Sequence, residues 1–232
     1  MHSKADIVTI KAVHDALEEL ADQVVFVGGA TVSLYAQRQA LELRPTDDVD
    51  ILIEIYSRAE YIELEQKLRN KGFAPDPTAR FVGRFKIDDK ITVDVMPTLP
   101  EVLGFSNPWY PQAFAQAIKK EIEEGVFINI FTAPYFIATK LEAFKNRGKN
   151  EQGELDGRLS QDLEDIVFVF EHRTDIFQEM KDAEPELREY LRAEFTALMN
   201  HPYFEEWVDA NTSYSSPRMV RVILFSIQEF IE

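Results

Sequence analysis

Up to residue 132, the spacing of hydrophobic positions switches repeatedly between that of helices and that of strands. Apolar residues recur every three or four positions over 6–22, which predicts a helix. The run Val24–Val27 then ends in Gly28-Gly29, a pattern typical of a strand, a tight turn and a following helix. The remaining pattern predicts strands at 49–55, 81–88, 90–96 and 126–131, helices at 30–43, 57–71 and 111–124, and a loop at 98–111.

From Pro134 onward the strand spacing fades and helical spacing takes over, with further helices expected at 160–172, 174–181, 184–199 and 216–231. The polar segment 148–158 contains glycines and is predicted to be a loop that either gates substrate or has no role. We therefore expect the fold class α/β (α+β), with a mixed-sheet domain at 1–132 followed by a mainly helical domain at 133–232.

Composition limits the kinds of function that these elements can carry. The 232 residues include no cysteine, which excludes disulfides, cysteine-ligated zinc and thiol nucleophiles and fits a reducing cytoplasm. The N-terminus lacks the apolar core of a signal peptide, and no apolar run approaches the roughly 18 residues that span a bilayer. The net charge of −16 argues against a broad surface for duplex DNA, although a local basic patch or bound metal still permits a nucleotide substrate. We expect a soluble cytoplasmic protein without a membrane partner.

The glycine pair is the first candidate for chemistry. Without Cβ atoms, Gly28 and Gly29 let the backbone approach a ligand closely, and the N–H groups at the start of a following helix can hold a phosphate. Thr31 is placed either to contact that phosphate or to cap the helix. The alternative interpretation is a plain turn between a strand and a helix.

Three aspartates are the second candidate for chemistry. Asp48 and Asp50 are two residues apart at the start of a strand, so their side chains project from the same face. Asp94 lies inside another apolar strand, where a carboxylate is costly to bury unless it is paired or bound to metal. Carboxylate oxygens are suitable ligands for Mg²⁺ (or Mn²⁺), and three from two strands can form a two-metal site for phosphoryl or nucleotidyl transfer. The alternatives are an exposed turn around Asp47 and a core aspartate paired with Arg or Lys.

These residues stand in the order Gly28-Gly29, Arg44-x-Thr46-x-Asp48-Val49-Asp50 and Asp94. The set resembles the signature of the nucleotidyltransferase superfamily, the DNA polymerase beta fold. In particular it is similar to the AbiEii/AbiGii-type enzymes, the toxin half of abortive-infection toxin–antitoxin pairs. The resemblance implies that the three aspartates are catalytic and bind the metals, with Asp94 available as the base for an incoming hydroxyl. It also implies that Gly28, Gly29, Thr31, Arg44 and Thr46 bind the nucleotide.

The helical part contains the concentrated basic patch of this acidic chain. Lys140 and Arg147 are seven residues apart and share a helical face. The resemblance implies that Lys140 contacts the triphosphate, that Arg147 also binds the nucleotide, and that Asp162 and Asp165 pack back toward the site. Alternatively, both cations are solvated and Asp162 caps its helix. Gln161 departs from the family pattern, in which an arginine is common before the first aspartate.

Three functions follow, and all of them use the same aspartates. The leading one is a Mg-dependent nucleotidyltransferase that moves a nucleoside monophosphate from an NTP to an acceptor hydroxyl. The resemblance implies a toxin acting on tRNA, another RNA or a protein, with a cognate antitoxin as partner. The second is a transferase for aminoglycoside-like small molecules, which the acidic surface favours. The third is a non-catalytic module that binds nucleotides or partners.

Overall fold

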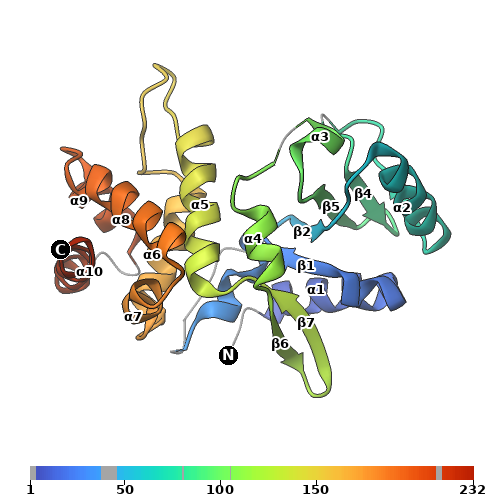
Figure 1. The fold of residues 1–232 in the computed structure, drawn as a ribbon, viewed down its shortest axis with the longest axis horizontal. Helices are drawn as coiled ribbons and strands as arrows, with labels where there is room; N and C mark the ends of the chain where they lie inside the picture. The colour runs from blue at the N-terminus through green and yellow to red at the C-terminus, as the bar shows by residue number, and fades with distance from the viewer. Residues whose placement is uncertain (1–3, 38–45, 80, 105, 213–215) are drawn as a thin grey trace. The chain divides into compact units, whose positions relative to one another are not determined.

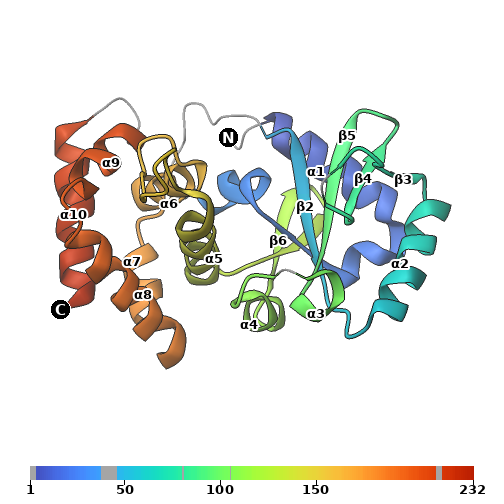
Figure 2. The ribbon, with the colours of Figure 1, turned by 90° about the horizontal axis from the view of Figure 1, so that it is seen from above.

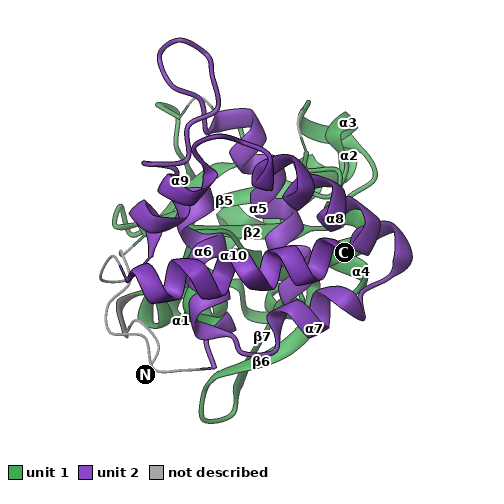
Figure 3. Cartoon of the chain, turned by 90° about the vertical axis from the view of Figure 1, so that its left-hand side faces the viewer, with its two compact units in different colours: residues 1–34, 40–132 green, residues 35–39, 133–232 purple. Residues whose placement is uncertain are grey.

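The computed structural model describes residues 4–37, 46–79, 81–104, 106–212 and 216–232. It divides into two compact units, which are drawn in different colours in Figure 3. Unit 1 comprises residues 1–34 and 40–132, and unit 2 comprises residues 35–39 and 133–232. Arg44, one of the predicted nucleotide-binding residues, lies outside the described residues.

Unit 1 is built on a mixed sheet (Figure 1). Its elements, with η marking 3₁₀ helices, are α1 (Lys4–Leu17), η1 (Glu18–Gln23), β1 (Val24–Val27), η2 (Gly29–Tyr35), β2 (Asp48–Ile53), α2 (Arg58–Asn70), β3 (Phe73–Pro75), β4 (Arg84–Ile87), β5 (Ile91–Pro97), α3 (Pro100–Leu103), α4 (Tyr110–Ala115), β6 (Ile118–Glu123) and β7 (Val126–Ile130). Within the described residues the sheet has seven strands in the order β3-β4-β5-β2-β1-β7-β6.

The centre of this sheet is buried on both faces. All four residues of β1 are buried, as the unbroken apolar run Val24–Val27 predicts for a central strand. Helix α1 packs against β2 and β5, and α3 and α4 lie near the carboxyl ends of these strands (Figure 2). Strand β1 pairs antiparallel with β2 and parallel with β7, and β2 pairs parallel with β5. The middle of the sheet therefore brings together strands that are far apart in the sequence.

Unit 2 is helical. It contains α5 (Ala133–Arg147), α6 (Gln161–His172), α7 (Ile176–Lys181), α8 (Pro185–Met199), α9 (Phe204–Asn211) and α10 (Pro217–Ile231). Serine side chains cap two of these helices, because Ser160 accepts a hydrogen bond from the Leu163 N–H and Ser216 accepts one from the Met219 N–H. Its core combines aliphatic side chains with large aromatic ones, among them the fully buried Phe136, Phe144, Phe195, Trp207 and Phe230. The predicted fold class, a mixed α/β sheet followed by a helical part, is confirmed.

The prediction of a helix over 111–124 is wrong beyond residue 115. Residues 118–123 have good helix-forming composition, but they form the edge strand β6, which hydrogen-bonds to β7 across the turn at Gly125. Tertiary pairing overrides local propensity here. The pattern also missed the short elements β3, α3 and α9. The helix predicted at 30–43 is a 3₁₀ helix as far as Tyr35, and 38–45 lie outside the described residues.

Candidate active site

The strand register places the three predicted aspartates together. Asp50 pairs directly with Asp94 across the parallel strands β2 and β5, and Asp48 pairs with Thr92. Directly paired residues point to the same face, and residues two apart on one strand do so too. Asp48, Asp50 and Asp94 therefore form one carboxylate cluster on one face of the sheet.

Arg84 of β4 completes this cluster. It pairs with Asp94 in the antiparallel β4–β5 register. Its Nε donates to Asp94 Oδ1 at 2.7 Å and its Nη2 donates to Asp94 Oδ2 at 2.6 Å, which is the bidentate geometry of a strong ion pair. Nη2 also donates to Asp48 Oδ2 at 3.1 Å. The hydrogen bonds to Asp94, followed by the Asp94, Asp48 and Asp50 charges, raise the pKa of Arg84 although partial burial opposes them.

Negative charge exceeds positive charge in this cluster. Burial, and then the neighbouring Asp94 carboxylate, raise the pKa of Asp48 above its ordinary value, and Arg84 only partly offsets them. Three carboxylates surround one guanidinium, so a further cation would be attracted there. The oxygen donors fit Mg²⁺ or Mn²⁺ in their chemistry. Among the described residues, however, no three acidic or histidine side chains are arranged to hold a metal ion, and both Asp94 oxygens accept hydrogen bonds from Arg84.

Gly28 packs against the side chain of Asp50. Its φ of +74° is in the left-handed region, which favours glycine. A Cβ at this position would lie 2.9 Å from Asp50 Cγ and closer still to Oδ2, so only glycine leaves room for that carboxylate. Thr31 is completely buried and its hydroxyl donates to the Gly28 carbonyl at 2.9 Å. The turn thus positions Asp50, and a phosphate contact by Thr31 stays a prediction.

The segment before β2 is held by a residue that the sequence pattern did not reveal. Asp6 of α1 is buried, and its Oδ1 accepts hydrogen bonds from both the backbone N–H and the hydroxyl of Thr46, each at 3.3 Å. This contact anchors the chain two residues before Asp48. The available sequence signal is that Asp6 stands four residues before Ile10, on the apolar face of the predicted helix. Nucleotide binding by Thr46 stays a prediction.

In unit 2 the four predicted polar residues form one ion-pair network. Lys140 of α5 contacts two residues of α6, since its Nζ lies 3.3 Å from Asp162 Oδ1 and 2.5 Å from Asp165 Oδ2. Arg147 donates to Asp162 through Nε at 2.6 Å and Nη2 at 2.7 Å. The charges of the two cations and the two carboxylates balance. Because the cations belong to α5 and the carboxylates to α6, the network links these two helices.

Burial and the charges of the partners have opposite effects on the pKa values of Lys140 and Asp162. Only 6% of Lys140 and 2% of Asp162 are exposed. Burial alone would raise the pKa of Asp162, but the hydrogen bonds and charges of Arg147 and Lys140 outweigh it and lower that pKa. Burial would likewise lower the pKa of Lys140, but Asp165 and Asp162 outweigh it and raise that pKa. Asp165 differs, because burial raises its pKa and Lys140 offsets that effect only in part. The charged forms of Lys140 and Asp162 are therefore the favoured ones. Contact of Lys140 with a triphosphate stays a prediction.

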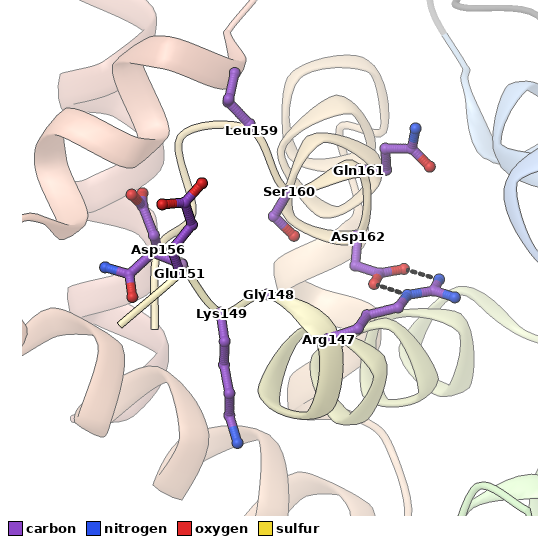
Figure 4. Close-up of a pocket in the computed structure, with 10 residues that line it drawn as sticks. Arg147, Gly148, Lys149, Glu151, Asp156, Leu159, Ser160, Gln161 and Asp162 are labelled. Atoms are coloured by element: carbon purple, nitrogen blue, oxygen red, sulfur yellow. Dashed lines mark hydrogen bonds and ion pairs between the residues drawn. The ribbon is translucent and has the colours of Figure 1, made fainter. Parts of the chain in front are cut away.

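Beside this network lies a pocket of about 400 Å³ (Figure 4). Arg147 and Asp162 face one another at its edge, and Lys149, Glu151 and Asp156 belong to the adjoining loop. The loop predicted at 148–158 therefore lines a real pocket in unit 2. Its side chains carry both signs of charge, so the pocket does not select an anion by charge alone.

A search of solved structures finds this fold elsewhere. The chain is similar in fold to a solved nucleotidyltransferase-like protein. The matching structure is an antigenic nucleotidyltransferase-like protein from Paracoccidioides brasiliensis, with a TM-score of 0.51 and 16% sequence identity over 90% of this chain and 94% of the other. At this identity the likeness establishes a shared fold. No model of a known protein family matches the chain, and no curated protein matches its sequence.

None of the helices within the described ranges combines the length and the apolar character needed to cross a bilayer.

Proposed function

We propose that the chain is a nucleotidyltransferase that moves a nucleoside monophosphate from an NTP to an acceptor hydroxyl. The carboxylate cluster carries this proposal, because Asp48, Asp50 and Asp94 share one face of paired strands and adjoin a glycine turn. The nucleotidyltransferase-like fold of the similar structure supports the same chemistry. The chain's own contribution is to hold three hard oxygen donors close together in a partly buried place.

Asp48, Asp50 and Asp94 would hold Mg²⁺ or Mn²⁺, which supplies Lewis-acid stabilisation of the phosphoryl charge when bound. In this proposal Asp94 can also accept the proton of the acceptor hydroxyl, once its oxygens no longer bond to Arg84. Gly28, which has no Cβ, leaves the space that the Asp50 carboxylate occupies. The proposed nucleotide contacts are Gly28, Gly29, Thr31, Arg44 and Thr46 in unit 1, and Lys140 and Arg147 in unit 2.

We further propose that the acceptor is a macromolecule, tRNA or another RNA or a protein, and that the chain is the toxin of an AbiE-like pair with a cognate antitoxin. The support is the resemblance of the run Arg44-x-Thr46-x-Asp48-Val49-Asp50 to that family. The net charge of −16 favours the second candidate, a transferase for cationic small molecules. The Arg84–Asp94 pair favours a third, a nucleotide-binding module without transfer.

The test is incubation with each labelled NTP, Mg²⁺ and total tRNA, with an aminoglycoside as a parallel acceptor. Asp48→Ala/Asp50→Ala should abolish label transfer while the variant stays folded by circular dichroism. The control is Asp47→Ala, because Asp47 is exposed and immediately precedes β2. Equal transfer by wild type and the double variant would refute the proposed site. Label on the aminoglycoside alone would select the second candidate, and Mg-NTP binding without any transfer would select the third.

A further inference from the structure

The position of Arg84 has a consequence for metal binding. Its guanidinium contacts Asp94 through two nitrogens and Asp48 through one of them. Asp94 and Asp48 are two of the three carboxylates that the proposed function assigns to a divalent cation. Arginine is charged at every relevant pH, so the protein carries a permanent cation of its own at this site.

A guanidinium and a divalent metal both bind a carboxylate through the lone pairs of its oxygens. Both Asp94 oxygens already accept short, charge-assisted hydrogen bonds from Arg84. A metal on the same oxygens would also repel the nearby guanidinium. Each Asp94 oxygen keeps a second lone pair, but a metal that used it would lie beside the guanidinium, so the two cations oppose one another at Asp94.

Arg84 can leave without dismantling the sheet. Its side chain is 34% exposed, whereas that of Asp94 is only 12% exposed. The backbone of Arg84 is held by the β4–β5 ladder, and its long side chain can turn toward solvent while the strand stays paired. Asp94, in contrast, is held within the sheet and would meet either cation in the same place.

We infer that Arg84 is a built-in competitor of the divalent cation: it neutralises the carboxylate cluster when metal is absent and must leave Asp94 when metal binds. This inference rests on the proposed function, because it assumes that the cluster binds metal. It adds a residue and a step that the carboxylates alone do not suggest. Arg84 stabilises the metal-free protein and lowers its apparent affinity for metal.

Metal affinity can be measured directly by titrating metal-free protein with Mn²⁺ and following free Mn²⁺ by electron paramagnetic resonance. Removing the competitor with Arg84→Gln should tighten Mn²⁺ binding at least roughly tenfold, the scale of one charge-assisted hydrogen bond. The matched control is Lys86→Gln, because Lys86 lies two residues along the same strand and pairs with Asp76 instead, at 3.1 Å. Lys86→Gln removes the same charge from the same face and should change affinity far less.

Thermal unfolding gives a second measurement that needs no activity. Without metal, Arg84→Gln should unfold at a lower temperature than wild type, and saturating Mn²⁺ should raise its melting temperature more than that of wild type. Arg84→Lys keeps the charge but loses the bidentate geometry, so its Mn²⁺ affinity should lie between the two. This variant carries the test if Arg84→Gln does not fold.

Two different results would overturn the inference, and they can be told apart. If wild type binds Mn²⁺, Asp48→Asn abolishes that binding, and Arg84→Gln or Arg84→Lys binds no more tightly than wild type, then Arg84 is not a competitor and the proposed metal site stands. If neither wild type nor Arg84→Gln binds Mn²⁺ at millimolar concentration, the metal site itself is refuted, and the inference falls with it.

Discussion

Adding one methyl group at Gly28 should displace Asp50 from the carboxylate cluster. In Gly28→Ala, the added Cβ would lie 2.9 Å from Asp50 Cγ, and Asp50 must turn away. The backbone also has to hold alanine at a φ of +74°. Gly125→Ala is a matched control, because its φ is +76° but a Cβ there meets nothing within 4 Å. The two variants therefore share the backbone strain and differ in the displacement of Asp50.

An L-residue in the left-handed region costs about 1–2 kcal/mol, so both variants should lose about that much unfolding free energy. Forcing Asp50 off its preferred rotamer adds about 1 kcal/mol in Gly28→Ala only. The larger difference should be functional, since Asp50 is a proposed metal ligand. We expect Mn²⁺ affinity and label transfer to fall at least roughly tenfold in Gly28→Ala, the effect of losing one charged interaction, and to stay near wild type in Gly125→Ala.

Urea unfolding followed by circular dichroism gives the stability of both variants, and electron paramagnetic resonance of Mn²⁺ gives the affinity. Wild-type Mn²⁺ affinity in Gly28→Ala, together with equal stability losses in the two variants, would refute the role of Gly28 in making room for Asp50. A loss of Mn²⁺ affinity in both variants would trace the effect to stability instead.

Two further predictions concern buried polar groups. Asp162→Asn should lower the unfolding free energy by about 3 kcal/mol at pH 7, because it leaves Lys140 and Arg147 with a neutral partner. Since the folded-state pKa of Asp162 is below its ordinary value of 3.8, its stabilising effect is complete above that value and is lost as pH falls through the lower folded pKa. Urea unfolding measured at a series of pH values should therefore show a constant stability gap between the two proteins from pH 7 down to about pH 3.8, and a gap that narrows below that pH. A gap that already narrows well above pH 3.8 would contradict the pKa direction. Burial raises the pKa of Tyr61 to about 12, and its hydroxyl has no hydrogen-bond partner within the described residues. Tyr61→Phe should raise stability by about 1 kcal/mol, because an unsatisfied buried hydroxyl is removed. Tyr135→Phe, which loses a 3.3 Å hydrogen bond to Glu184, should not raise it.

Several features were predictable because they depend on neighbours in the sequence. The apolar run Val24–Val27 and its glycine pair indicate a buried strand and a turn, and both are present. The two-residue spacing of Asp48 and Asp50 gives them a common face. Helices α5 to α8 and α10 follow from apolar periodicity, which is the same in any helix that packs one face on a core.

Strand pairing was not predictable in the same way, and β6 illustrates why. Its charged sequence favours a helix, but hydrogen bonds to β7 make it an edge strand. Edge strands bury little apolar surface, so they leave a weak pattern in the sequence. The pairing of Asp6 with Thr46 likewise joins residues 40 positions apart, and no local periodicity encodes such a contact.

Sequence by itself determined which carboxylates lie on the strands, but only the tertiary structure decided their partner. A two-residue turn at Asp88-Asp89 would place Val93 opposite Arg84. In the structure the turn holds three residues, Ile87 pairs with Ile91, and Arg84 therefore pairs with Asp94. Because side chains alternate between the faces of a strand, a register shift of one residue reverses which ones meet. The contact between Arg84 and the carboxylate cluster depends on that register, which is set by pairing across the whole sheet.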